Sequence, residues 1–226
     1  MNYQLNFAAV WRDFDTLLAG LGLGLQLALL SIAIGCVIGL LMAFAMLSRH
    51  RALRIIASVY VTVVRNTPIL VLILLIYFAL PSLGIRLDKI SSFIITLSLY
   101  AGAYLTEVFR AGLVNIPKGL REAGLAIGLG EWRIRAYITV PVMLRNVLPA
   151  LSNNFISLFK DTSLVTIVSL YELTGALSLA LGSDPAWRPF KIEAYLFIAA
   201  IYFGFCFAMS RYSLRVERRL AAARGG

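Results

Sequence analysis

Charged residues are scarce in this chain of 226 residues: Asp, Glu, Lys and Arg together make up only 14% of it. It has a single histidine, His50, which lies between Arg49 and Arg51 in a basic stretch, where a solvated surface role fits better than catalysis. The sequence has no cluster of His and Cys with the spacing of a metal site. These shortages argue against a metalloenzyme.

Two catalytic motifs are also missing from the sequence. It has no Gly-x-Ser-x-Gly elbow, and no Gly-x₄-Gly-Lys-Ser/Thr loop with which it would hydrolyse ATP itself. The two cysteines, Cys36 and Cys206, lie in apolar segments, as small buried hydrophobic residues do, and predict no disulfide framework. We therefore expect a protein that is not an enzyme and that binds no cofactor or metal of its own.

Long apolar runs are what the sequence has in quantity, since 60% of the residues are hydrophobic. A hydrocarbon core about 30 Å thick needs about 20 consecutive apolar residues in a helix. The sequence predicts an all-α integral membrane protein, a single transmembrane domain over residues 1–226 with five spanning helices. The predicted spans are about 16–48, 55–85, 90–112, 136–160 and 190–213.

The basic residues divide unevenly between the two sides of these spans. Thirteen of the 21 Lys and Arg residues lie on one side and five on the other, and Arg65, Arg145 and Lys160 fall within or beside spans. The thirteen are Arg49, Arg51, Arg54, Arg110, Lys118, Arg121, Arg133, Arg135, Arg211, Arg215, Arg218, Arg219 and Arg224, and the five are Arg12, Arg86, Lys89, Arg188 and Lys191. The positive-inside rule then predicts an N-terminus outside and a C-terminus in the cytoplasm.

This distribution also bears on partners. The net charge of +10 is spread over loops of a lipid-embedded chain, which argues against nucleic acid as a partner. A basic C-terminal tail is suited to contact anionic membrane lipid.

A polar interruption at about 115–135 lies on the predicted cytoplasmic side. It predicts a short helix with Asn115 as cap and Pro117 at the first position, ended by Gly128 with positive φ. Small residues would keep one face of this helix low enough for another protein to approach: Ala123, Gly124 and Ala126. The alternative interpretation is an ordinary amphipathic surface helix.

The same interruption resembles the EAA loop of ABC importer permeases, which docks on the ATPase subunit. Glu122, Ala123 and Gly128 match the family pattern, and Ile138 and Pro141 follow at its spacing. Gly124 stands where the family has a second alanine, and Val140 replaces its leucine. The resemblance implies these ATPase-docking residues: Gly119, Arg121, Glu122, Ala123, Gly124, Ile127 and Gly128.

Further blocks extend the resemblance along most of the chain. Arg65–Val71, Ala103–Gly112, Phe159–Leu164 and Glu172-Leu173 resemble permeases for polar amino acids, the histidine, glutamate, glutamine, arginine and opine type. The resemblance implies the type I ABC importer permease fold with a cytoplasmic coupling helix, in the bacterial cytoplasmic (inner) membrane. It also implies a second permease copy or paralogue, an ABC ATPase subunit dimer that holds ATP and Mg, and an external substrate-binding protein that delivers an amino acid.

Charged side chains within spans cost about 2.5–3.5 kcal/mol each at the bilayer centre, so they should face the bundle interior or a watered cavity, and pair. The candidate pathway residues are Asp161, Thr162, Ser163, Asn154, Arg65 and Glu107. The three residues at 161–163 favour a helix break, which at membrane depth is tolerated where it lines a cavity. Structural pairing, for example with Lys160, is the alternative role of these charges. Residues 173–182 are too few to span and predict a re-entrant or interfacial segment.

Other functions compete less well. A secondary transporter normally has more spans and a repeated half, and neither is evident here. A membrane enzyme lacks its motif, and a structural assembly factor would not explain the docking loop. A permease for another small polar solute stays open as an alternative. Which amino acid is carried, and whether the permease dimer is homomeric, do not follow from the sequence.

Overall fold

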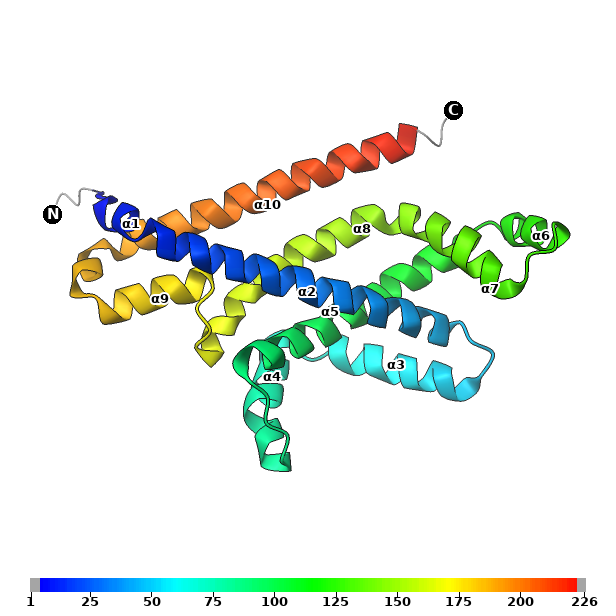
Figure 1. Cartoon of the computed structure of the whole chain (residues 1–226), viewed down its shortest axis with the longest axis horizontal. Helices are drawn as coiled ribbons and strands as arrows, with labels where there is room; N and C mark the ends of the chain where they lie inside the picture. The colour runs from blue at the N-terminus through cyan, green and yellow to red at the C-terminus, as the bar shows by residue number, and fades with distance from the viewer. Residues whose placement is uncertain (1–4, 223–226) are drawn as a thin grey trace. The chain divides into compact units, whose positions relative to one another are not determined.

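The computed structural model describes residues 5–222, and every regular element in that range is a helix (Figure 1). The α-helices are α1 (Ala8–Arg12), α2 (Phe14–Met46), α3 (Arg51–Arg65), α4 (Ile69–Leu74), α5 (Lys89–Val114), α6 (Lys118–Ala126), α7 (Glu131–Ile134), α8 (Val140–Asp161), α9 (Leu173–Ser183) and α10 (Lys191–Ala222). Turns of π-helix cover Leu75–Ala79 and Arg135–Thr139, and 3₁₀ turns cover Leu80–Leu83, Thr162–Val168 and Pro185–Phe190.

Within the described residues, four helical stretches are long and apolar enough to cross a membrane, and a fifth is obtained if the two helices on either side of residues 66–68 are counted together. The predicted spans 16–48, 90–112 and 190–213 correspond to α2, α5 and α10. The predicted span 136–160 falls in an unbroken helical stretch from 131 to 161.

The second predicted span, 55–85, was wrong as a single helix. Helix α3 ends at Arg65 and α4 begins at Ile69. Pro68 has no N–H to donate and disfavours the helical conformation of the residue before it. The side chains of Asn66 and Thr67 also turn back to the carbonyls of Thr62 and Val63, at 2.7 and 2.8 Å, and so take up carbonyls at the end of the helix.

The chain separates into two compact units built from alternating segments. The first contains Met1–Ile32, Ile69–Leu97 and Phe155–Met209, and the second contains Ala33–Pro68, Ser98–Asn154 and Ser210–Gly226. Arg224, counted above in the tail, lies outside the described residues. The single domain over 1–226 stays a prediction.

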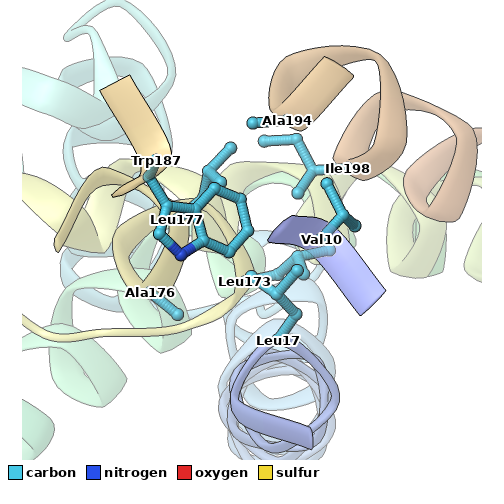
Figure 2. Packing of buried hydrophobic residues seen from close by; sticks show 8 residues of the cluster. All are labelled: Val10, Leu17, Leu173, Ala176, Leu177, Trp187, Ala194 and Ile198. Carbon is cyan, nitrogen blue, oxygen red and sulfur yellow. The ribbon is translucent and has the colours of Figure 1, made fainter. Parts of the chain in front are cut away.

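The first unit has an apolar core at the start of α2. It is formed by Val10, Leu17, Leu173, Ala176, Leu177, Trp187, Ala194 and Ile198 (Figure 2). Trp187 is fully buried, and its indole N–H donates to Asp13 Oδ2 at 2.6 Å, so the polar atom of this large side chain is satisfied. This core fastens the short helix α9 to α1, α2 and α10.

In the second unit, glycines of α2 let α5 approach closely. A Cβ at Gly35 would lie 2.7 Å from the Cβ of Ala101, and one at Gly39 would lie 2.8 Å from the Cβ of Leu105. Small residues at such spacing are typical of contacts between membrane helices, where close packing replaces the hydrophobic effect.

Two other glycines of α2 provide a matched pair for testing packing in the first unit. A Cβ at Gly20 would lie 2.9 Å from backbone atoms of Glu172 and Leu173, whereas a Cβ at Gly22 would meet nothing within 4 Å. We expect Gly20→Ala to destabilise the protein by about 1–3 kcal/mol through overpacking. Gly22→Ala should be neutral or stabilising by up to about 1 kcal/mol. Thermal melting of both variants in detergent checks this, and equal melting temperatures would contradict the close contact.

Candidate functional site

The predicted docking helix is present as α6, and its end has the expected geometry. Gly128 has φ of +81°, its N–H donates to the carbonyl of Leu125, and the N–H of Leu129 donates to the carbonyl of Gly124. This pair of bonds is a Schellman motif, which needs a residue with positive φ just past the helix. The sequence-based prediction for Gly128 is confirmed.

Two details of the predicted docking helix were wrong. Pro117 is the cap rather than the first helical residue, and no side chain caps α6, so Asn115 does not have that role. Gly124 is buried, and a Cβ there would lie 3.0 Å from side-chain atoms of Ile134 and Ile138. Its small size therefore lets α6 pack on the following segment of the same chain, and Gly124 is not on the exposed surface.

The other residues proposed for docking are accessible. Gly119, Arg121, Glu122, Ala123, Ile127 and Gly128 are all exposed. Ile127 and Trp132 are 76% and 81% exposed, and both lie outside the predicted spans, where exposed apolar side chains are typical of a surface that meets a partner. Arg121 forms an ion pair with Glu131, and this guanidinium lowers the pKa of the Glu131 carboxyl. The pair holds α6 to α7 and leaves the apolar residues of the loop uncovered.

The structure brings two of the predicted pathway residues, Arg65 and Glu107, into one cavity in the second unit. The cavity has a volume of about 380 Å³ and is lined by Met46, Ser58, Val61, Thr62, Arg65, Asn66, Tyr104 and Glu107. This is within the range of small-molecule pockets, roughly 300–1,000 Å³.

Each of the two charges in this cavity is held in place. The Arg65 guanidinium lies 5.2 Å from the centre of the Tyr104 ring, a cation–π contact. Glu107 Oε2 accepts two hydrogen bonds from Arg110, at 2.6 and 3.0 Å, so the expectation that this charge would be paired is confirmed. The cavity thus presents a cation and an anion that are fixed before any ligand arrives.

The other proposed pathway residues lie elsewhere. Asn154 in the second unit donates to the carbonyl of Ala150 in its own helix, at 2.8 Å. In the first unit, α8 ends at Asp161 and a 3₁₀ turn begins at Thr162, so the predicted helix break is present. Thr162 is buried and donates to the carbonyl of Phe159, whereas Asp161 and Ser163 are half-buried. A pathway role for these four residues stays a prediction.

Sequence reasoning gave no role to Glu172, which joins three segments of the first unit through hydrogen bonds. This glutamate is fully buried and caps α9, where its Oε1 accepts from the N–H groups of Thr174 and Gly175 at 2.9 and 3.0 Å. Its Oε2 accepts from the Tyr202 hydroxyl at 2.7 Å, and Thr166 donates to Oε1 at 3.3 Å. The sequence did offer one signal for this role: a carboxylate placed immediately before an uncharged helical stretch is typical of a helix N-cap.

These features define a class of protein. Long apolar helices, a cavity with fixed charges of both signs and an exposed apolar loop together define an integral membrane transport protein that works with a partner. Comparison with known families gives the same class: residues 35–222 match the binding-protein-dependent transport system inner membrane component. The chain belongs to this family.

Curated relatives of nearly the same length agree with this membership. The glutamine transport system permease protein GlnP of Escherichia coli strain K12 is 35% identical over 96% of this chain and 98% of its own length. The L-cystine transport system permease protein TcyB of Bacillus subtilis strain 168 is 37% identical over 87% of this chain and 82% of its own length.

Solved structures confirm the predicted type I ABC importer permease fold. A crystal structure of an amino acid ABC transporter with histidines matches with a TM-score of 0.84 and 30% identity, covering 96% of this chain and all of that one. The inward-facing MetNI methionine ABC transporter matches with a TM-score of 0.70 at 21% identity, which supports the fold alone.

Proposed function

We propose that this chain is the transmembrane permease subunit of an ATP-driven importer and forms the pathway for a polar amino acid. The observation that carries this proposal is its similarity along almost the whole chain to a glutamine transport permease, at 35% identity. The cavity that holds Arg65 and Glu107 supports it, because a zwitterion needs partners of both signs. Another small polar solute is the alternative substrate.

The partners follow from the same proposal. An ABC ATPase subunit dimer binds α6 and its exposed apolar neighbours, and ATP and Mg are held there rather than by this chain. A second permease copy or a paralogue shares the pathway, and an external binding protein delivers the amino acid. Closure of the ATPase dimer on ATP moves α6, and the permease then alternates between outward-open and inward-open states.

Within the cavity, each charge has a distinct task. The Arg65 guanidinium, backed by Tyr104, donates charge-assisted hydrogen bonds to the substrate carboxylate. The Glu107 carboxylate, positioned by Arg110, faces the ammonium group. Both contacts are made to the charged backbone groups of the substrate, and neither depends on the length of its side chain. This cavity therefore recognises the amino-acid backbone rather than any one side chain.

Removal of the cation in this cavity should impair transport. We expect Arg65→Gln to reduce uptake of labelled amino acid by about tenfold or more, because a hydrogen bond to a charged group contributes about 1.5–3 kcal/mol. The measurement is uptake of an amino-acid panel by proteoliposomes that contain the permease, its ATPase and its binding protein.

The matched control is Asn66→Ala, which changes the same cavity but removes a side chain whose amide is bonded to its own helix at Thr62. Its uptake should stay within about threefold of wild type, since its hydrogen bond contributes about 0.5–1.5 kcal/mol to stability rather than to transport. Normal uptake by Arg65→Gln, with normal assembly, would remove the cavity from the pathway. No uptake of any amino acid by the wild-type complex would contradict the proposed substrate class.

The orientation of the chain in the membrane has its own test. In a background without Cys36 and Cys206, cysteines that replace Ser48 and Gly130 should react with an impermeant thiol reagent only from the cytoplasmic side. A cysteine that replaces Ser183 should react only from outside. The reason is the excess of Lys and Arg beside the first two positions. Reaction of the Gly130 position from outside in sealed cells would reverse the topology and remove α6 from the reach of an ATPase.

A further inference from the structure

A larger cavity lies in the second unit, near the ends of α2 and α5. Its volume is about 800 Å³, and its walls come from α2 and the turn after it, from α5, α6 and α7, and from the π-helical turn before α8. Apolar side chains form part of the lining: Phe44, Leu47, Leu113 and Ile134. The cavity is separate from the one that contains Arg65 and Glu107, because the two share no lining residue.

The charged lining of this cavity is predominantly positive. It contains three arginines, Arg49, Arg121 and Arg135, and one acidic residue, Glu131, a net charge of +2 (three minus one). Glu131 is committed to Arg121, to which it is hydrogen bonded and ion-paired. Among the described residues, Arg49 and Arg135 form no ion pair, but their charges help to lower the pKa of the same Glu131 carboxyl. Three cations therefore share one anion at this cavity.

Both cations are presented by an organised framework. The Arg135 guanidinium lies 5.7 Å from the centre of the Phe44 ring, so this aromatic side chain supports it on one side. The turn that carries Arg49 is fastened by Arg54, whose Nη1 donates to the carbonyls of Ser48 and Arg49 at 2.9 and 3.2 Å. In the same turn, the N–H of His50 donates to Ser48 Oγ at 3.1 Å.

We propose that this cavity binds the phosphate headgroup of an anionic membrane phospholipid, with Arg49 and Arg135 on the phosphate. Basic pockets at the ends of membrane helices are where anionic headgroups bind, and both α2 and α5 are membrane-length helices that end here. The apolar wall favours lipid over free inorganic phosphate, because it offers a surface to the glycerol and the first methylenes of the acyl chains. Arginine suits a phosphate because its planar fork donates two parallel hydrogen bonds.

The test compares two double variants with the same change of charge. Arg49→Gln/Arg135→Gln removes both cations of the cavity, and Arg51→Gln/Arg133→Gln removes two exposed arginines close by in sequence that do not line it. The permease in complex with its ATPase is purified in detergent and titrated with phosphatidylglycerol, phosphatidylcholine or inorganic phosphate. Retained lipid is measured by native mass spectrometry, and the melting midpoint is measured in parallel.

We expect wild type and the control double variant, Arg51→Gln/Arg133→Gln, to retain phosphatidylglycerol and to melt at a higher temperature when it is added. Their melting temperature should not rise with phosphatidylcholine or inorganic phosphate. The cavity double variant, Arg49→Gln/Arg135→Gln, should bind phosphatidylglycerol about 30-fold more weakly, since each basic residue near an anionic surface contributes about 1 kcal/mol. Its unchanged melting in phosphatidylcholine would show that the fold is intact.

Three results would overturn the proposal. Equal loss of affinity in both pairs would mean a diffuse surface charge rather than a site. An equal rise in melting temperature with inorganic phosphate would assign the cavity to a free anion. Absence of retained phosphatidylglycerol from the wild-type complex with its ATPase would overturn the lipid site and assign the two arginines to acidic side chains of that partner.

Discussion

Glu172→Ala is expected to destabilise the permease by about 3–5 kcal/mol, because it removes the acceptor of several buried or half-buried donors and the cap of α9. The donors that lose their partner are the N–H groups of Thr174 and Gly175 and the hydroxyl of Tyr202. The predicted effect is large because Glu172 is fully buried, so water does not take its place. Thermal melting in detergent, followed by tryptophan fluorescence, measures it.

Two further variants make this test specific. Glu172→Gln keeps one carbonyl oxygen for the N–H groups at the start of α9 and should lose less than half as much stability. Glu217→Ala removes an exposed carboxylate from α10 and should melt like wild type within about 0.5 kcal/mol. If Glu172→Ala melted like Glu217→Ala, the carboxylate would not have the role that its hydrogen bonds indicate.

Gly128→Val should abolish coupling while leaving the membrane helices folded. A β-branched residue with φ near +81° is strongly disfavoured, and the strain is about 1–3 kcal/mol. The Schellman motif would open, and the end of α6 with the exposed Ile127 would shift from the surface that we propose for the ATPase. We expect ATP hydrolysis stimulated by the loaded binding protein to fall by about tenfold or more, with normal insertion.

The controls separate backbone strain from mere loss of a glycine. Gly128→Asn should retain most activity, because asparagine tolerates the left-handed conformation. Gly130→Val should also be tolerated, since Gly130 has φ of −70° and ψ of 157°, which suits a β-branched side chain, and a Cβ there meets nothing within 4 Å. Full stimulation in Gly128→Val would leave the loop as ordinary surface.

The sequence predicted those elements whose cause is local. Uninterrupted apolar runs determine α2, α5 and α10, because a helix in lipid satisfies its own backbone hydrogen bonds. The turn at Gly128 follows from the freedom of glycine at positive φ, and the break after Asp161 follows from side chains that compete with the helix for hydrogen bonds. Pro68 is an equally local signal for the break in 55–85, and the prediction of one span over these residues did not use it.

Features that depend on contacts between distant residues could not be predicted from the sequence. Gly124 is a small residue of the kind expected on an open docking face, but the side chains of Ile134 and Ile138 cover it. Its burial depends on how α6 packs on the segment that follows it, which the sequence does not show. Glu172 resembles any helix cap until Tyr202, 30 residues later, donates to its second oxygen. Arg65 and Glu107 were expected to need a partner or a cavity, but nothing in their spacing indicates that they share one.

The sequence by itself therefore determined the class of this protein, its longest membrane helices and the family it resembles, because hydrophobicity, helix propensity and motif spacing are properties of the sequence alone. Only the tertiary structure decided which of the charges within the predicted spans are satisfied and which line a cavity. A charge in a membrane protein is tolerated only with the partners that packing brings to it, and those partners lie on other helices.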